Sequence, residues 1–561
     1  MAGEPSVGDA FLRGLAARGV DFFFANPGTD FASIVESLAR AGRDGTPVPQ
    51  PIVVPHENVA VGMAYGVAMV TGHPQAVMVH VNVGTANALC GLINASRENI
   101  PMLLCAGRTP ILEAGALGAR NLNIHWAQEM FDQGAIVREH VKWDYELRDP
   151  RSLDTVLDRA LAIAKSEPRG PIYLSLPREV LAGAAVPSVA TQVAPALLGA
   201  PDPLAIRELA ALVAAARMPV IVTARAGGEP AAVAELAALA ERYAIPVVEY
   251  RPRYNSLPIE HPMHGGAETG PWLDAADALV VLDSDVPWIP SQAVPRDGVK
   301  VAQIGADPLF ARYPVRGFRS DLTITATPLA VIRSLAQALA ANPPPADRVT
   351  TRRAEVATRV RTRRAALEEQ IARGAQMRPM GMAYVSRVLA ELLPADAIVI
   401  NEYSLVPMAM RFDQPGTFFG SSPVGGLGWG VPAALGAKLA APDRLVVAAV
   451  GDGSYEFANP LACHHTAALH GIAMLTVVMN NEAYGAVERA TRSLYPEGSA
   501  AREGMELVSL APTPAFETVI SSCGGHGERV EDPAELRGAF EHALRVVCEE
   551  RRQALVNVIC R

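Results

Sequence analysis

The chain has 561 residues, of which 50% are hydrophobic and 19% charged, and its formal net charge is −9. Such a chain can bury several cores, so extensive disorder is not expected, and the acidic balance disfavours nucleic acid and acidic membranes as partners. The first residues do not resemble a secretory signal, no apolar run approaches the ~20 residues that span a bilayer, and the six cysteines form no CxxC pair. These features predict a cytoplasmic protein with reduced thiols and no membrane segment.

Residues 1–185 are predicted to form a first α/β domain. Short β-branched or aromatic runs alternate with stretches of helical spacing, and this alternation predicts a parallel sheet with helices on both faces. Strands are expected at 21–25, 52–54, 76–80, 102–105 and 171–176, with helices at 31–40, 57–70 and 85–97.

A proline- and alanine-rich stretch at 186–200 is predicted to be a linker. The alternation resumes in a central domain, 195–342, and the prolines that follow it mark a further boundary. Residues 347–374 are charged and periodic, and they predict a solvated helix that links two domains. The central strands are expected at 220–223, 247–249, 279–282 and 301–304, with a helix at 231–243.

The third domain, 375–561, has expected strands at 398–401, 445–450 and 475–479. It matches the first domain in length and in its order of elements. The fold class predicted for the chain is therefore α/β, with three doubly wound parallel-sheet domains.

Two polar motifs follow adjacent strands of the third domain. Gly451-Asp452-Gly453-Ser454 comes directly after one buried strand, and Asn480-Asn481 comes directly after the next. Open α/β sheets bind ligands at this end of their strands, and glycines let backbone N–H groups approach a phosphate. Asp452, Asn481 and the carbonyl of Ala483 offer three oxygen ligands, which two phosphate oxygens and a water would complete into a Mg²⁺ octahedron. Each motif alone is more often an ordinary turn or loop.

Together the motifs resemble the GDG…NN signature of thiamine-diphosphate enzymes, and the resemblance covers nearly the whole chain. The most similar members are acetolactate synthase and benzoylformate decarboxylase. The resemblance implies that the first domain binds the pyrimidine ring, the third binds the diphosphate and Mg²⁺, and the central domain is structural. The segments that carry it are FFFANPGTD, HENVAVGMAYGVAMVTG, GTANALCGLINA, GGLGWGVPAALGAKLA and MNNEAYGA.

The resemblance assigns the remaining cofactor contacts. Glu57 is expected to face the pyrimidine N1′ and to promote formation of the C2 ylid; alternatively, it only complements a helix dipole. The Gly425 carbonyl and the Leu427 N–H are expected to hold the pyrimidine, with Leu427 wedged beneath both rings unless it is an ordinary core leucine. The contacts expected on the diphosphate side are Tyr403, Ser404, Gly453, Ser454 and Tyr484.

The substrate residues are less defined. His80 matches a proton-relaying histidine of benzoylformate decarboxylase; alternatively, it caps a strand end. Thr29 matches a serine that holds the substrate carboxylate in that enzyme; alternatively, it is a helix N-cap. His56-Glu57, Gln128-Glu129 and Lys142 instead resemble acetolactate synthase. That enzyme's arginine-rich stretch and its selective tryptophan are missing, and Ala490 stands at the latter position. The sequence therefore predicts a roomier pocket and a larger substrate, and FAD is not expected.

The predicted function is a thiamine-diphosphate- and Mg²⁺-dependent decarboxylase or carboligase of 2-oxo acids. It would act through the C2 ylid and an enamine, which is protonated to an aldehyde or captured by an acceptor aldehyde. The alternatives are an acetolactate-synthase-like transferase that joins two 2-oxo acids, and a catalytically silent cofactor-binding partner. Because the family's pyrimidine and diphosphate domains meet across subunits, the expected minimal active unit is a homodimer, assembled into a homotetramer.

Overall fold

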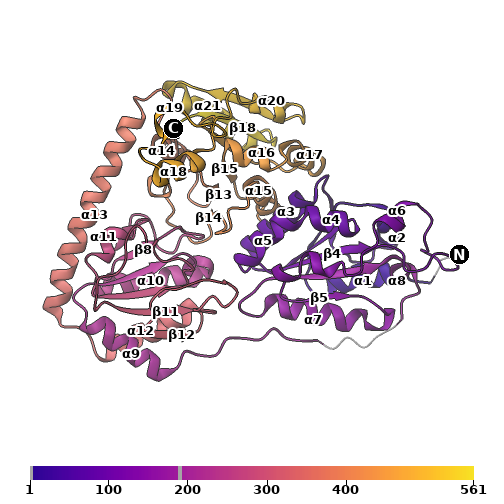
Figure 1. Cartoon of the computed structure of the whole chain (residues 1–561), viewed down its shortest axis with the longest axis horizontal. Coiled ribbons are helices and arrows are strands. Elements are labelled where there is room, and N and C mark those ends of the chain that lie inside the picture. The colour runs from indigo at the N-terminus through magenta and orange to yellow at the C-terminus, as the bar shows by residue number, and fades with distance from the viewer. Residues whose placement is uncertain (1–3, 187–191) are drawn as a thin grey trace.

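The computed structural model describes residues 4–186 and 192–561, which form three α/β units (Figure 1). Each unit contains a six-stranded sheet in which neighbouring strands are parallel, so the predicted fold class is confirmed. Residues 187–191 of the predicted linker lie outside the described residues. Within the described ranges, no helix has both the length and the apolar character needed to cross a membrane.

The sheet of the first unit has the order β2-β1-β3-β4-β6-β5. Strands β3, β4 and β6 are buried almost throughout because helices cover both faces. Its strands are β1 (Phe22–Ala25), β2 (Gln50–Val53), β3 (Gln75–Val79), β4 (Met102–Arg108), β5 (Asp144–Glu146) and β6 (Pro171–Pro177). Its helices are α1 (Val7–Ala17), α2 (Ala32–Asp44), α3 (Glu57–Thr71), α4 (Val81–Asn87), α5 (Leu89–Arg97), α6 (Ile124–Ala127), α7 (Leu153–Lys165) and α8 (Arg178–Ala182).

The prediction of one helix at 85–97 is wrong in two respects: the helix begins earlier, and it is not continuous. The chain turns directly after β3, where Val81 has a φ of 34°, and α4 begins at that residue. The helix is interrupted at Ala88, and α5 continues from there. The hydroxyl of Thr85 donates to the Val81 carbonyl at 2.6 Å, which stabilises the early turn.

The third unit repeats the strand order of the first, β14-β13-β15-β16-β18-β17. Numbered from the start of each unit, both orders are 2-1-3-4-6-5, so the similarity predicted between these domains is confirmed in their topology. Its strands are β13 (Ile398–Glu402), β14 (Phe418–Gly420), β15 (Val446–Gly451), β16 (Leu475–Asn480), β17 (His526–Val530) and β18 (Ala554–Ile559). Its helices are α14 (Met382–Leu392), α15 (Gly430–Ala440), α16 (Asp452–Phe457), α17 (Pro460–His470), α18 (Gly485–Leu494), α19 (Ser499–Glu503), α20 (Phe516–Ser521) and α21 (Pro533–Cys548).

The central sheet has a different order, β12-β11-β10-β7-β8-β9. Numbered within the unit this is 6-5-4-1-2-3, the order of dinucleotide-binding folds read from the other edge. Its strands are β7 (Pro219–Thr223), β8 (Val247–Glu249), β9 (His264–Gly266), β10 (Ala278–Leu282), β11 (Lys300–Gly305) and β12 (Leu322–Thr325). Its helices are α9 (Pro203–Ala215), α10 (Pro230–Tyr243), α11 (Gly270–Leu273) and α12 (Pro328–Ala341).

The long helix α13 (Ala346–Gly374) runs along one side of the molecule from the central to the third unit (Figure 1). The predicted linker helix is thus present, but it is not solvated throughout. Arg352 is buried, and its guanidinium donates to the carbonyls of Ala216, Arg217 and Tyr243. Burial lowers the pKa of Arg352 to about 10. Its charge complements the carboxyl ends of α9 and α10, which explains why a charged residue lies inside the core.

Helices α3 and α15 pack the first unit directly against the third. A Cβ on Gly66 would lie 2.0 Å from the Ala433 carbonyl oxygen, and one on Gly436 would lie 1.9 Å from that of Met63. The rings of Tyr65 and Trp429 also meet edge to face at 5.3 Å. Glu57 is the first residue of α3, and the 425–428 loop immediately precedes α15, so this contact fixes both segments relative to each other.

Candidate active site

The sequence-predicted residues lie at equivalent places in the first and third sheets. In each sheet the strand order reverses between the first and third strands, β1 and β3 in one and β13 and β15 in the other. Thr29 and His80 follow β1 and β3, whereas Tyr403 and Asp452 follow β13 and β15. Ligands of open α/β sheets bind at such reversal points, outside the carboxyl ends of the strands.

The buried carboxylate of Asp452 is the centre of an oxygen cluster. Its Oδ1 accepts from the Gly453 N–H at 2.9 Å, and its Oδ2 accepts from the Ala483 N–H at 3.2 Å. Burial raises the pKa of Asp452, and the largest opposing effects come from backbone N–H groups. A cation bound next to this carboxylate would stabilise its charged form.

The amide of Asn481 completes the cluster. One of its terminal atoms lies 3.2 Å from Asp452 Oδ1 and 2.9 Å from the Ala483 carbonyl oxygen. If this atom is the amide nitrogen, it donates to both oxygens. If it is the amide oxygen, as in the structure, three acceptors converge: this oxygen, Asp452 Oδ1 and the Ala483 carbonyl oxygen. Octahedral Mg²⁺, with bonds of about 2.0–2.1 Å, requires neighbouring ligand oxygens to be about 2.9 Å apart. The three residues brought together here therefore fit Mg²⁺.

The backbone next to this cluster can accept an anion. Asp452, Gly453 and Ser454 form the first turn of α16, and helix N-termini of this kind bind phosphate groups. The ring of Tyr484 packs against Gly453, where a Cβ would lie 3.0 Å from it. An alanine at position 453 would require the Tyr484 ring to shift by a few tenths of an ångström.

Tyr403 and Ser404 are less free to contact a ligand. Tyr403 has a φ of 61°, an unusual conformation for a tyrosine, and its hydroxyl donates to the Ser422 carbonyl at 3.1 Å. Ser404 is buried, and its hydroxyl donates to Asn401 at 3.2 Å. Half of the Tyr403 side chain remains exposed, whereas Ser404 mainly shapes the turn after β13.

Two residues that the sequence analysis did not single out hold the loop at 425–428. Glu402, buried at the end of β13, accepts from the N–H groups of Gly428, Trp429 and Gly430. Burial raises the pKa of Glu402 to about 7, against the lowering effect of these three bonds. From the first unit, Asn94 donates to the Gly426 carbonyl at 2.8 Å.

Leu427 is half-buried at the tip of this loop, and among the described residues it belongs to none of the hydrophobic clusters. The alternative that it is an ordinary core leucine is therefore wrong. Gly425 and Gly428 both have positive φ, and a Cβ on Gly428 would lie 2.3 Å from the Phe457 carbonyl oxygen. These glycines allow the sharp turn that presents Leu427.

Glu57 begins α3 and is half-buried. Its carboxylate accepts from Asn87 Nδ2 at 2.6 Å, and the same Asn87 nitrogen lies 3.4 Å from His56 Nε2. Within the described ranges, the hydrogen bonds of Glu57 reach none of the residues around Asp452. The two predicted halves of the site are each assembled in one chain. The hydrogen bond from Asn94 to Gly426 joins the first unit to the 425–428 loop, but among the described residues no hydrogen bond or ion pair links Glu57 to Asp452 or Asn481.

His80 lies in a polar group at the reversal point of the first sheet. Its Nδ1 lies 2.5 Å from Asp30 Oδ1, and its Nε2 lies 3.2 Å from the side-chain amide nitrogen of Gln128. The hydrogen bond with Asp30 raises the pKa of His80, and the charge of Glu57 adds to this effect. The buried Asp30 was missed by the sequence analysis, although it directly follows Thr29.

Thr29 is exposed as the first residue of a short 3-10 helix, Thr29–Phe31. No side-chain hydrogen bond caps this helix or α2, so the alternative N-cap role of Thr29 is wrong. Lys142 does not join this group, because its ammonium donates to the Ile163 and Ser166 carbonyls at the end of α7. Ala490 lies on α18, which has no buried residue.

Comparison with known proteins defines the class of protein. The models "Thiamine pyrophosphate enzyme, N-terminal TPP binding domain", "central domain" and "C-terminal TPP binding domain" match residues 5–136, 206–335 and 403–558. The chain therefore belongs to the thiamine-pyrophosphate enzymes, thiamine pyrophosphate being another name for thiamine diphosphate.

Several individual members of this family are similar to the chain over most of its length. Benzoylformate decarboxylase of Pseudomonas aeruginosa is 27% identical over 94% of this chain and 95% of its own length. A protein of the same organism, described as probable 2-ketoarginine decarboxylase, is 30% identical over 86% of this chain and 83% of its own. Acetolactate synthases also match, at lower identity. The fold matches 4-hydroxybenzoylformate decarboxylase of Rhodococcus jostii RHA1, with a TM-score of 0.78, 23% identity and 99% of each chain covered.

Proposed function

We propose that this protein is a thiamine-diphosphate- and Mg²⁺-dependent decarboxylase of 2-oxo acids, with carboligation as a side or alternative outcome. The observation that carries the proposal is the convergence of oxygens from Asp452, Asn481 and Ala483 at separations suited to Mg²⁺. The first turn of α16 lies beside this cluster, and its Ser454 N–H would bind the diphosphate; Gly453, whose own N–H donates to Asp452, would let the diphosphate approach the backbone closely.

When bound, thiamine diphosphate supplies a nucleophilic carbon for the substrate carbonyl and an electron sink for loss of CO₂. The chain's own residues hold and activate it. Leu427 presents an apolar surface for the two rings, and Glu402 and Asn94 fix the loop that carries it. Glu57 would share a proton with the pyrimidine N1′. Shielding from water would help, because it favours the protonated form of a carboxyl group.

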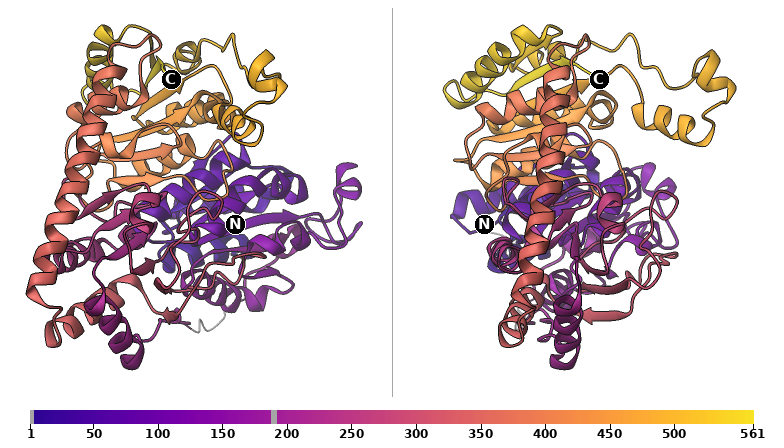
Figure 2. Two further views of the ribbon diagram at one scale, coloured as in Figure 1. Left: turned by 60° about the vertical axis from the view of Figure 1, so that its left-hand side comes forward. Right: turned by 90° about the vertical axis from the view of Figure 1, so that its left-hand side faces the viewer.

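We further propose that the complete site lies between two chains, in a homodimer that assembles into a homotetramer. The segment between β4 and α7, which includes the short helix α6, exposes Leu117, Trp126 and Phe131, and Phe131 is fully exposed. In the third unit, α18 and α19 stand away from the sheet, and Leu494 and Leu507 are 74% and 90% exposed (Figure 2). Large apolar side chains exposed on both candidate halves of the site support a partner chain that covers them.

The pair of His80 and Asp30 favours decarboxylation over ligation. Decarboxylation of a 2-oxo acid, R–CO–COO⁻ + H⁺ → R–CHO + CO₂, requires a proton donor at the former carboxyl-bearing carbon. Asp30 keeps His80 more readily protonated than an ordinary histidine, so it can supply this proton. Thr29 is exposed nearby and would hold the substrate carboxylate. Ala490 in place of a bulky ring, and relatives described as acting on benzoylformate and 2-ketoarginine, favour a substrate larger than pyruvate.

The test is a product analysis with the full-length protein, thiamine diphosphate, Mg²⁺ and a panel of aliphatic, aromatic and basic 2-oxo acids. Each reaction is run with and without an acceptor aldehyde, and CO₂, aldehyde and ketol are quantified. Aldehyde and CO₂ are the expected products. Acetolactate as the main product would support the synthase alternative instead. No turnover of any 2-oxo acid, with the coenzyme bound, would indicate the silent partner and contradict the proposal.

A further inference from the structure

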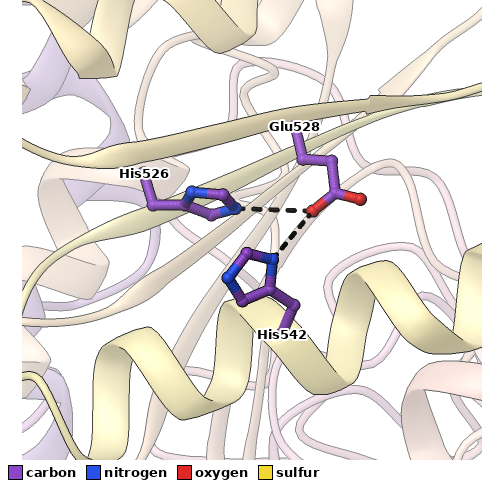
Figure 3. A group of neighbouring side chains, drawn as sticks. All are labelled: His526, Glu528 and His542. Atoms are coloured by element: carbon purple, nitrogen blue, oxygen red, sulfur yellow. Dashed lines mark hydrogen bonds and ion pairs between the residues drawn. The ribbon is translucent and has the colours of Figure 1, made fainter.

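A second polar cluster lies at the outer edge of the third sheet. His526 and Glu528 are two residues apart on the edge strand β17, so their side chains leave the same face of the sheet. Helix α21 packs across this face and contributes His542. Figure 3 shows the three side chains converging: one carboxylate oxygen of Glu528 faces both imidazoles, whose ring centroids lie 4.4 Å apart.

Two of the three separations in this cluster match those of a tetrahedral ligand set. His526 Nε2 and His542 Nδ1 lie 3.4 and 3.5 Å from the same carboxylate oxygen, Glu528 Oε2. The three ligand atoms all lie within 4.8 Å of one another. Tetrahedral Zn²⁺ with bonds of about 2.0–2.1 Å to nitrogen and oxygen requires ligand atoms about 3.3–3.4 Å apart. Two histidines and one carboxylate, moreover, are the ligand types of a zinc-class ion rather than of Mg²⁺.

We propose that His526, Glu528 and His542 form a site for a divalent transition-metal ion of the Zn²⁺ class. All three side chains are half-buried, so a water can complete the tetrahedron and the ion can enter from solvent. A second carboxylate nearby, Glu550, is paired with Arg552 and is therefore not counted among the ligands. The ion would join the edge strand β17 to α21 and so stabilise an edge that no other strand of the described residues covers.

This site is separate from the proposed Mg²⁺ cluster. Asp452 follows β15, and the sheet order places β16 and β18 between β15 and β17. Three strand spacings correspond to about 14 Å. Occupancy of the two sites can therefore be measured independently.

The competing explanation is a proton-linked group, in which Glu528 pairs with protonated histidines and no ion binds. The two explanations differ in Zn²⁺ affinity at neutral pH. Full-length protein is stripped of metal and then loaded with thiamine diphosphate and excess Mg²⁺, so that the Asp452 cluster is filled. Zn²⁺ is then titrated in competition with a chromophoric chelator, and Co²⁺ is added in parallel to record its visible absorption.

The wild-type protein is expected to bind one Zn²⁺ per chain at this site, and Co²⁺ to give the intense visible bands of a tetrahedral site. Glu528→Gln keeps the shape of the side chain and His542→Ala removes one imidazole; each should weaken Zn²⁺ binding at least about tenfold, because even loss of an outer-shell partner costs about 10–100-fold. His73→Ala removes an exposed histidine of the first unit and should change nothing. Equal Zn²⁺ affinity in all four proteins, or a wild type that takes up no Zn²⁺, would overturn the proposal.

Discussion

The close contact between α3 and α15 leaves no room for a Cβ at Gly436. Replacing Gly436 with alanine therefore tests how closely the two helices pack. The added Cβ would lie 1.9 Å from the Met63 carbonyl oxygen and 2.7 Å from its carbon. Both are backbone atoms in the middle of α3, so no side-chain rotation relieves the overlap. The two helices must separate, which reduces the packing around the rings of Tyr65 and Trp429.

Overpacking of a well-packed core costs about 1–3 kcal/mol, and a clash with backbone lies at the upper end of that range. We therefore expect Gly436→Ala to lower the free energy of unfolding by about 3 kcal/mol. The matched control is Gly42→Ala in α2, where a Cβ would meet nothing within 4 Å and should stabilise by about 0.5–1 kcal/mol. The assay is urea unfolding followed by circular dichroism and by tryptophan fluorescence. If Gly436→Ala unfolds at the same urea concentration as Gly42→Ala, the close helix contact is wrong.

Variants at two further positions, Asp30 and Glu402, test groups that position the site. Asp30→Asn removes the main cause of the raised pKa of His80, so the alkaline limb of kcat/KM for decarboxylation should move to lower pH; an unchanged pH–rate profile would exclude His80 as the proton donor. Because the pKa of His80 is raised in the folded chain, this pair stabilises the protein below the ordinary histidine pKa, and the effect is lost as pH rises through the raised value. Glu402→Ala leaves three buried N–H groups without an acceptor and should cost about 3–5 kcal/mol, measured by urea unfolding, together with weaker thiamine diphosphate binding. Glu402→Gln keeps one acceptor oxygen and should lose clearly less; equal losses in both variants would contradict this role.

Much of the candidate site could be predicted from the sequence because it is encoded locally. Asp452 and Asn481 each follow a strongly apolar strand, and parallel strands bring their carboxyl ends to one edge. Most of the buried internal strands and the long charged helix were predictable for the same reason, since each has a clear sequence pattern. The strands β5, β9, β12, β14 and β17 lie at sheet edges and were missed, whereas the short internal strand β8 was predicted; the internal strand β18 was also missed.

The residues that the sequence analysis missed act through partners far away in the chain. Arg352 is separated by more than a hundred positions from the carbonyls that make its burial favourable. Asn94 reaches Gly426 across two units, and nothing in its own segment indicates this contact. Glu402 and Asp30 did carry a signal, an acidic residue at or just beyond the end of a buried strand, but such residues are also common in first helical turns.

The central claim is that one chain supplies Asp452 and another supplies Glu57 to each site. Neither Glu57→Gln nor Asp452→Ala should turn over substrate alone, the first while still binding thiamine diphosphate and the second because Mg²⁺-dependent binding is lost. The decisive measurement is the decarboxylase activity of equal amounts of the two variants after co-expression in one cell, with chain mixing verified by two affinity tags. If the site crosses chains, random assembly leaves about a quarter of the sites with both native residues, and about a quarter of wild-type activity returns. If fully mixed assemblies stay inactive, both residues act within one chain, and the proposed architecture of the site is wrong.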